Sequence, residues 1–85
     1  MQLVALSVFD LKGEFFFPPF FARNEQEGRR SFMNLCRDKS TNIGLNPDDF
    51  NLLSIGSFDD STGLFSPNAN GVALFLCNGS SAITP

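Results

Sequence analysis

Five of the chain's six lysine and arginine residues fall in one short window, residues 23–39. They are Arg23, Arg29, Arg30, Arg37 and Lys39. Arg23, Arg30 and Arg37 recur every seven residues, close to two helical turns, so a helix would align them on one side. Such a row can follow the phosphates of a nucleic-acid backbone, which makes all five residues candidates for DNA binding. The alternative is an ordinary solvated helix face, in which Glu27 pairs with Arg30.

A second candidate feature is the segment Phe15–Phe21, which holds five of the eleven phenylalanines. Exposed aromatic rings stack on the bases of single-stranded nucleic acid. Phenylalanine has no polar tip, however, and the chain contains no tyrosine or tryptophan, which favours a core or an interface between two copies. Phe16, Phe20 and Phe21 are therefore candidates for base stacking or for a dimer contact.

Catalytic chemistry has little support in the sequence. Because there is no histidine, a serine or cysteine nucleophile would lack its usual general base. The acidic pairs Asp48-Asp49 and Asp59-Asp60 sit in turn-like stretches without the spacing of a calcium loop, so we expect them to cap turns. Cys36 and Cys77 form no Cys-x-x-Cys motif and are expected to be reduced and buried. We therefore expect no enzyme, no catalytic residue, no metal site and no cofactor.

Size and charge narrow the class of protein. A chain of 85 residues forms one domain. Such a chain buries only roughly 60–65% of its unfolded surface, so we expect a homodimer to cover surplus phenylalanine surface. The net charge of −3 argues against a general polyanion binder. Met1–Leu6 has no basic region, and no apolar run reaches the roughly 20 residues of a membrane span. We expect a cytoplasmic protein without membrane contact.

Hydrophobic alternation and turn residues predict an α+β fold, with one helix packed on a face of an antiparallel sheet of four to five strands. The expected order is β-β-α-β-β-β, with strands at 3–9, 14–17, 50–58, 64–65 and 72–77 and a helix at 24–38. Asn24 suits the helix N-cap, and Glu27 completes a capping-box pattern. Pro18-Pro19 should end the second strand, after which the chain crosses the protein as an extended link. Residues 1–78 form the expected domain, and 79–85 a polar, frayed tail.

The predicted faces of these elements decide which residues reach the core. At 100° per residue, one side of the helix collects five residues. They are Gly28, Ser31, Phe32, Leu35 and Cys36. Arg30, Met33 and Arg37 lie on the opposite side. On the strand at 50–58, strict alternation separates two groups. One group is Phe50, Leu52, Ser54, Gly56 and Phe58, and the other is Leu53 and Ile55.

Several short motifs occur in a defined order along the chain. They are Phe9-Asp10-x-Lys12, Phe17-Pro18-Pro19-Phe20, Arg30-x-Phe32, Asn46-Pro47-Asp48-Asp49-Phe50 and Gly56-x-Phe58-Asp59-Asp60-x-Thr62-Gly63. The ordered set resembles the small non-structural protein family of gokushovirus-type microviruses, which are tail-less phages with circular single-stranded DNA genomes. Arg30 matches the arginine of the family motif, and Phe32 matches a core position of its helix.

The resemblance implies a phage protein that is made in the cytoplasm of the bacterial host and is absent from the mature virion. It further implies non-enzymatic binding of single-stranded DNA, the phage genome, during genome synthesis and packaging. Two other functions stay open. One is a protein–protein adaptor that acts on a host replication protein or on capsid assembly, and the other is an inhibitor of a host enzyme.

Overall fold

The structure is a computed structural model that describes residues 1–82. Its strands are β1 (Gln2–Asp10), β2 (Phe15–Phe16), β3 (Phe20–Ala22), β4 (Phe50–Asp59), β5 (Leu64–Pro67) and β6 (Leu74–Asn78). Its helices are α1 (Glu25–Arg37) and the one-turn α2 (Asn42–Leu45), with 3-10 turns η1 (Pro47–Asp49), η2 (Ala69–Gly71) and η3 (Gly79–Ala82). The predicted α+β class, antiparallel sheet and single main helix are confirmed.

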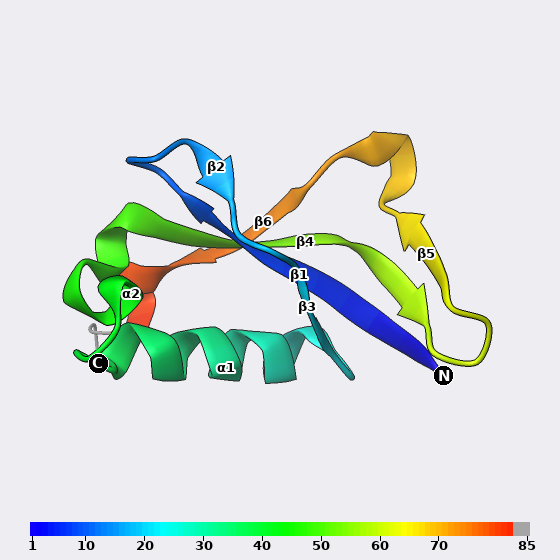
Figure 1. Cartoon of the computed structure of the whole chain (residues 1–85), viewed down its shortest axis with the longest axis horizontal. Coiled ribbons are helices and arrows are strands. Elements are labelled where there is room, and N and C mark those ends of the chain that lie inside the picture. Colours follow the sequence, from blue (N-terminus) through cyan, green and yellow to red (C-terminus); the bar gives the residue numbers. More distant parts are fainter. Residues whose placement is uncertain (83–85) are drawn as a thin grey trace.

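Two long strands, β1 and β4, form the centre of the sheet and pair along almost their whole length. Each has an outer neighbour that is interrupted halfway: β2 and β3 pair with β1, and β6 and β5 pair with β4. The sheet therefore has six strands, but it is only four strands wide at either end of the central pair. α1 lies along one side of the sheet, and β2 and the β5–β6 connection rise on the other (Figure 1).

The double proline does not send the chain across the protein, so the predicted extended link is wrong. β2 before the prolines and β3 after them both pair with the free side of β1. The Phe17 N–H donates to the Val8 carbonyl at 2.8 Å, immediately before the break. Because Pro18-Pro19 lacks N–H donors, it interrupts the hydrogen bonds of an outer strand without displacing the chain.

A bulge in β4 changes the face that its last residues occupy. Ala5 pairs with Gly56, but the next residue of β1, Leu6, pairs with Ser54, so Ile55 is the extra residue. Paired residues share a face and successive residues of β1 alternate, so Ser54 lies on the α1 side and Gly56 on the other. The single face predicted for alternate residues of 50–58 therefore holds only as far as Ser54.

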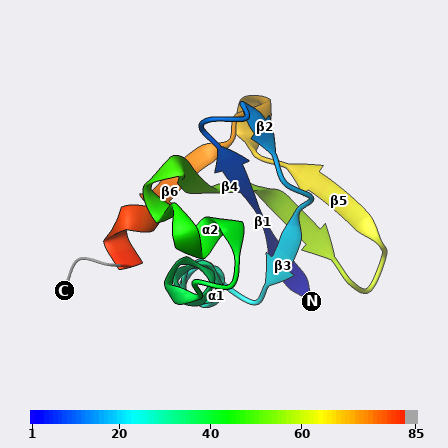
Figure 2. The same ribbon diagram turned by 60° about the vertical axis from the view of Figure 1, so that its left-hand side comes forward.

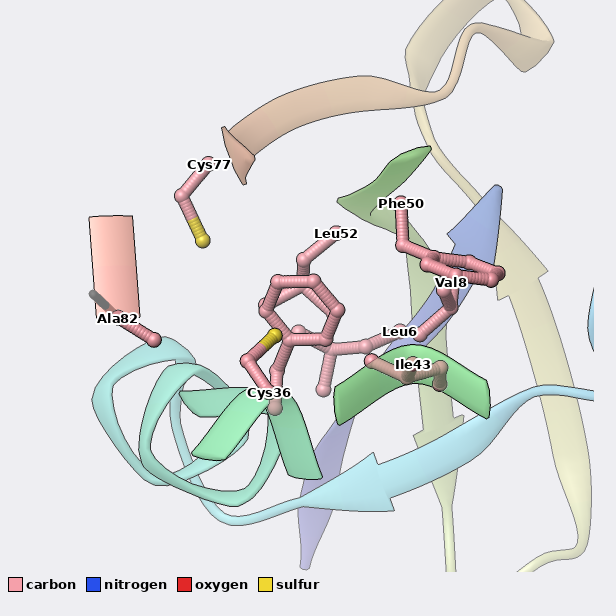
Figure 3. Packing of buried hydrophobic residues seen from close by; sticks show 9 residues of the cluster. Leu6, Val8, Cys36, Ile43, Phe50, Leu52, Cys77 and Ala82 are labelled. Atoms are coloured by element: carbon pink, nitrogen blue, oxygen red, sulfur yellow. The ribbon is translucent and has the colours of Figure 1, made fainter. Parts of the chain in front are cut away.

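The core lies between α1 and the sheet (Figure 3). Phe32 is fully buried, at 0% exposure, and belongs to one cluster with Leu6 of β1 and Leu52 of β4. The other buried members are Val8, Cys36, Ile43, Phe50, Cys77 and Ala82. A Cβ atom on Gly28 would lie 2.7 Å from a Leu6 methyl carbon, so a glycine at this position lets α1 approach β1 closely.

The buried side of α1 is rotated from the predicted one. Three of the five predicted core residues are buried, namely Gly28, Phe32 and Cys36. Ser31 and Leu35 are exposed, whereas Met33, predicted on the outer side, packs against the core. η3 packs against the helix, and helical periodicity contains no information about this distant partner.

Residues 79–82, which the sequence assigned to a frayed tail, form η3. Gly79 and Ala82 are buried, and the Ala82 carbonyl accepts a hydrogen bond of 3.2 Å from the Arg37 side chain. Small side chains at these two positions let the turn pack against α1 and η1. The remainder of the predicted tail, 83–85, lies outside the described residues.

Candidate nucleic-acid interface

The first turn of α1 fixes Arg23, the first of the predicted DNA-binding residues. The Asn24 side chain accepts the Glu27 N–H at 2.9 Å, which confirms the predicted N-cap. The Glu27 carboxylate turns back to Arg23, with 3.0 Å between Oε2 and the arginine Nε. The pair predicted between Glu27 and Arg30 is therefore wrong, and the charge of Arg23 is largely offset by its neighbour.

Two further arginines donate hydrogen bonds to backbone carbonyls of the C-terminal segment. Arg29 is half-buried, and its Nη1 lies 3.4 Å from the Leu76 carbonyl of β6. The Nε of Arg37 donates to the Ala82 carbonyl at 3.2 Å, although the residue remains exposed. Arg29 thus holds α1 to the sheet, whereas Arg37 combines a structural contact with an accessible charge.

Arg30 and Lys39 are exposed, and within residues 1–82 neither makes a hydrogen bond or an ion pair. A hydrogen bond of 2.6 Å from the Ser40 hydroxyl lowers the pKa of Asp38, which keeps a carboxylate beside Lys39 ionised. We call Arg30, Arg37 and Lys39 the basic patch. It covers the outer side and C-terminal end of α1.

The three candidate phenylalanines do not share one surface. Phe20 pairs with Leu6, is half-buried and packs against the core on the α1 side. Phe16 and Phe21 are exposed on the opposite side of the sheet. The Phe16 ring lies 4.8 Å from Phe9, and the Phe21 ring lies 5.2 Å from Phe58.

We call the side of the sheet away from α1 the open face. The strand register places six phenylalanines there. They are Phe9, Phe16, Phe21, Phe58, Phe65 and Phe75. Sequence reasoning missed Phe65 and Phe75, although Leu53 and Ile55 on the second face of their partner strand β4 already indicated that both faces are apolar.

A pocket of about 310 Å³ lies on the open face, between the breaks in the two outer strands. The central strands contribute Ser7 and Ile55, one outer strand contributes Phe16 and Pro19, and the other side is closed by Ala73. The Ser7 hydroxyl donates to the Phe17 carbonyl at 2.7 Å, so it connects the segment between β2 and β3 to β1. The pocket is mainly apolar and carries no charged side chain.

The fold separates the two sets of candidate residues. α1, which carries Arg30 and Arg37 of the basic patch, lies along one side of the sheet (Figures 1 and 2), and the strand register places the exposed rings of Phe16, Phe21, Phe65 and Phe75 on the other side. The basic patch and the exposed rings of the open face therefore form two separate surfaces of the molecule.

The model of one protein family, described as Phage ORF5 protein, matches residues 3–82. The chain belongs to the Phage ORF5 protein family. Comparison with curated proteins and with solved structures finds no match. Among residues 1–82, no helix is long and apolar enough to cross a membrane.

The residues of the sequence motifs mainly build the architecture of the protein. In Arg30-x-Phe32, the phenylalanine is buried in the core and the arginine is exposed. Asp59 accepts the Ser61 N–H at 2.9 Å, which lowers the pKa of the aspartate and confirms its predicted role as a turn cap. Asp60 accepts a hydrogen bond of 2.8 Å from the N-terminal amine, which ties the start of β1 to the β4–β5 turn.

Proposed function

We propose that this phage protein binds single-stranded DNA without enzymatic activity, during genome synthesis and packaging in the host cytoplasm. The observation that carries the proposal is the basic patch, where Arg30 and Lys39 have no protein partner within residues 1–82. Membership of a phage family and the resemblance to microviruses with single-stranded genomes also support it. We expect the protein to be absent from the mature virion.

The basic patch would contact phosphates rather than bases. Arg30 and Arg37 are seven residues apart, which is roughly 10 Å along the helix, so they can reach different phosphates of one strand. Contacts of this kind position a protein on nucleic acid but contain no sequence information. We therefore propose low sequence specificity, and modest affinity because Glu25, Glu27 and Asp38 also lie on or beside α1.

Salt dependence tests the proposal. If the three cations of the basic patch neutralise phosphates of a single strand, the slope of log affinity against log salt is about −2, or a loss of about 20-fold between 50 and 200 mM salt. Arg30→Gln should weaken binding of a labelled oligonucleotide and reduce this slope by about 0.7. Fluorescence anisotropy measures both quantities.

Lys12→Gln is the matched control, because it removes one positive charge from an exposed turn away from α1. It should leave binding nearly unchanged. An equal loss in both variants would indicate a nonspecific effect of net charge and would contradict the basic patch as the site. Absence of binding at low salt would contradict DNA binding altogether.

A second candidate function is a protein–protein adaptor or inhibitor, which acts on a host replication protein or on capsid assembly. The uncharged, phenylalanine-rich open face favours it, since exposed apolar patches of this kind mark interaction sites. Purified capsid protein and purified host replication proteins are the partners to test in pull-down. Phe75→Glu should abolish such an interaction and Arg30→Gln should preserve it, whereas DNA binding has the reverse pattern.

A further inference from the structure

Four exposed rings of the open face come from four different outer strands. Phe16 of β2 is 49% exposed and Phe21 of β3 is 44% exposed. Phe65 of β5 is 46% exposed and Phe75 of β6 is 59% exposed. β2 and β6 flank one end of the central pair and β3 and β5 flank the other, so the rings surround the middle of the face rather than one edge.

The charge distribution distinguishes between the occupants that this face could take. None of the described strand positions on the open face carries a charged side chain. A nucleic acid would bring one phosphate per nucleotide to a surface with no cation to neutralise it. The exposed cations of the basic patch belong to α1 and to the residues just after it, and α1 lies along the other side of the sheet (Figure 1). An uncharged apolar surface is the better match for this face.

We propose that a second copy of this chain covers the open face, so that two sheets pack face to face with both α1 helices outermost. Such an interface is isologous, because the same phenylalanine-rich surface is used by both copies. Sheets packed in this way lie about 10 Å apart, with side chains of the two inner faces interdigitating. This surface is distinct from the proposed DNA site and does not depend on it.

The four exposed rings supply about half of the area that each partner in a stable dimer buries. A phenylalanine buries about 200 Å² when fully covered, so four half-exposed rings offer roughly 400 Å² in each copy. Each partner in a stable interface buries about 800 Å². Partly exposed residues between the rings provide further apolar surface. These are Leu3, Phe9, Leu53, Ile55 and Phe58.

The pocket supplies a place for one ring of the second copy. Its volume is about 310 Å³, and it lies in the middle of the open face beside Ser7 and Ile55. A smaller apolar cavity of about 150 Å³ holds a benzene ring in a protein interior. Aromatic anchors that enter such pockets typically dominate the binding energy of an interface.

Sedimentation velocity of the full chain, without nucleic acid, tests the proposal. The wild type should sediment as a dimer with twice the 9.3 kDa mass of one chain. Phe75→Glu should weaken dimerisation by about 30-fold or more, as expected when an aromatic hot spot of an interface is replaced by a charge. Phe65→Glu, on β5, provides a second variant in case the first does not fold. Circular dichroism checks that each variant is folded.

Leu45→Glu is the matched control, because Leu45 is 58% exposed but belongs to α2, near α1. It should dimerise like the wild type. A wild type that sediments as a monomer at the highest soluble concentration would overturn the proposal. So would dissociation caused by Leu45→Glu but not by either phenylalanine variant. A monomer whose DNA binding is lost in Phe75→Glu would assign the face to base stacking instead.

Discussion

The two faces of the sheet are both apolar, but only one is covered by a helix. On the α1 side, Phe32, Leu6 and Leu52 are fully buried in one cluster. On the open face, Phe16 and Phe75 keep about half of their surface in water. One helix of 13 residues covers only one side of a sheet, so this chain has more apolar strand surface than its own helix can cover. The same residue type is therefore structural on one face and available for binding on the other.

Phe32→Ala should give the largest effect, because it leaves a cavity in the covered face. We expect a loss of about 3–5 kcal/mol in the free energy of unfolding, enough to unfold much of the protein. Phe75→Ala should cost only about 0.5 kcal/mol, as for a surface residue. Urea denaturation at low protein concentration compares the two variants. Equal losses would contradict the difference between the two faces.

Gly79→Ala tests whether η3 is packed against α1 and η1 as part of the core. A Cβ atom at this position would collide with the Pro47 carbonyl oxygen, so the backbone must shift. We expect a loss of about 1–3 kcal/mol by thermal or urea unfolding, as for an overpacked site. Ser81→Ala, an exposed change in the same turn, should stay within about 0.5 kcal/mol. Full stability of Gly79→Ala would show that residues 79–82 are frayed after all.

Ionisation of the two cysteines, which are buried between α1 and the sheet, should have the smallest effect on stability at neutral pH. Burial raises the pKa of Cys36 to about 11 and also raises the pKa of Cys77. The pKa of Cys36 is higher in the folded state than in the unfolded state, so the folded protein keeps the thiol protonated where the unfolded chain loses the proton. The free energy of unfolding is therefore unaffected at neutral pH and falls as the pH rises between about 9 and 11. Both thiols should react slowly with an alkylating reagent, since the thiolate is the reactive form.

A cysteine introduced on the open face provides the control for thiol reactivity. Phe75→Cys should react rapidly under the same conditions, because position 75 is exposed. Mass spectrometry counts the modified thiols over time. Rapid modification of Cys36 in the folded wild type would contradict its burial.

Local signals predicted the fold class and the main helix. Asn24 has a short-range capping partner, and the long apolar stretches of β1 and β4 fit strands without any knowledge of the rest of the chain. The bulge at Ile55 could not be predicted, because one inserted residue in β4 leaves no mark in its composition. The rotation of α1 also depends on a distant partner, η3, whose packing is not encoded in helical periodicity.

The candidate site was predicted less well than the fold. Sequence spacing aligned Arg23, Arg30 and Arg37, and it could not show that Glu27 would pair with Arg23. The contact between Arg29 and the Leu76 carbonyl joins residues 47 positions apart, so only the tertiary fold reveals it. Phe20 and Phe21 are adjacent, yet strand alternation sends them to opposite faces. The pairing of β3 with β1 had to be known before Phe20 could be assigned to the core and Phe21 to the open face.

The interruptions of the outer strands also determine how a chain so rich in phenylalanine can aggregate. β2 and β3 contain two and three residues, and β5 and β6 contain four and five. A long, flat edge with unpaired backbone groups is a template on which further chains add one after another into fibres. Pro18-Pro19 on one edge and η2 on the other divide that template into pieces too short to propagate it. Breaks of this kind therefore disfavour open-ended growth at both edges of the sheet.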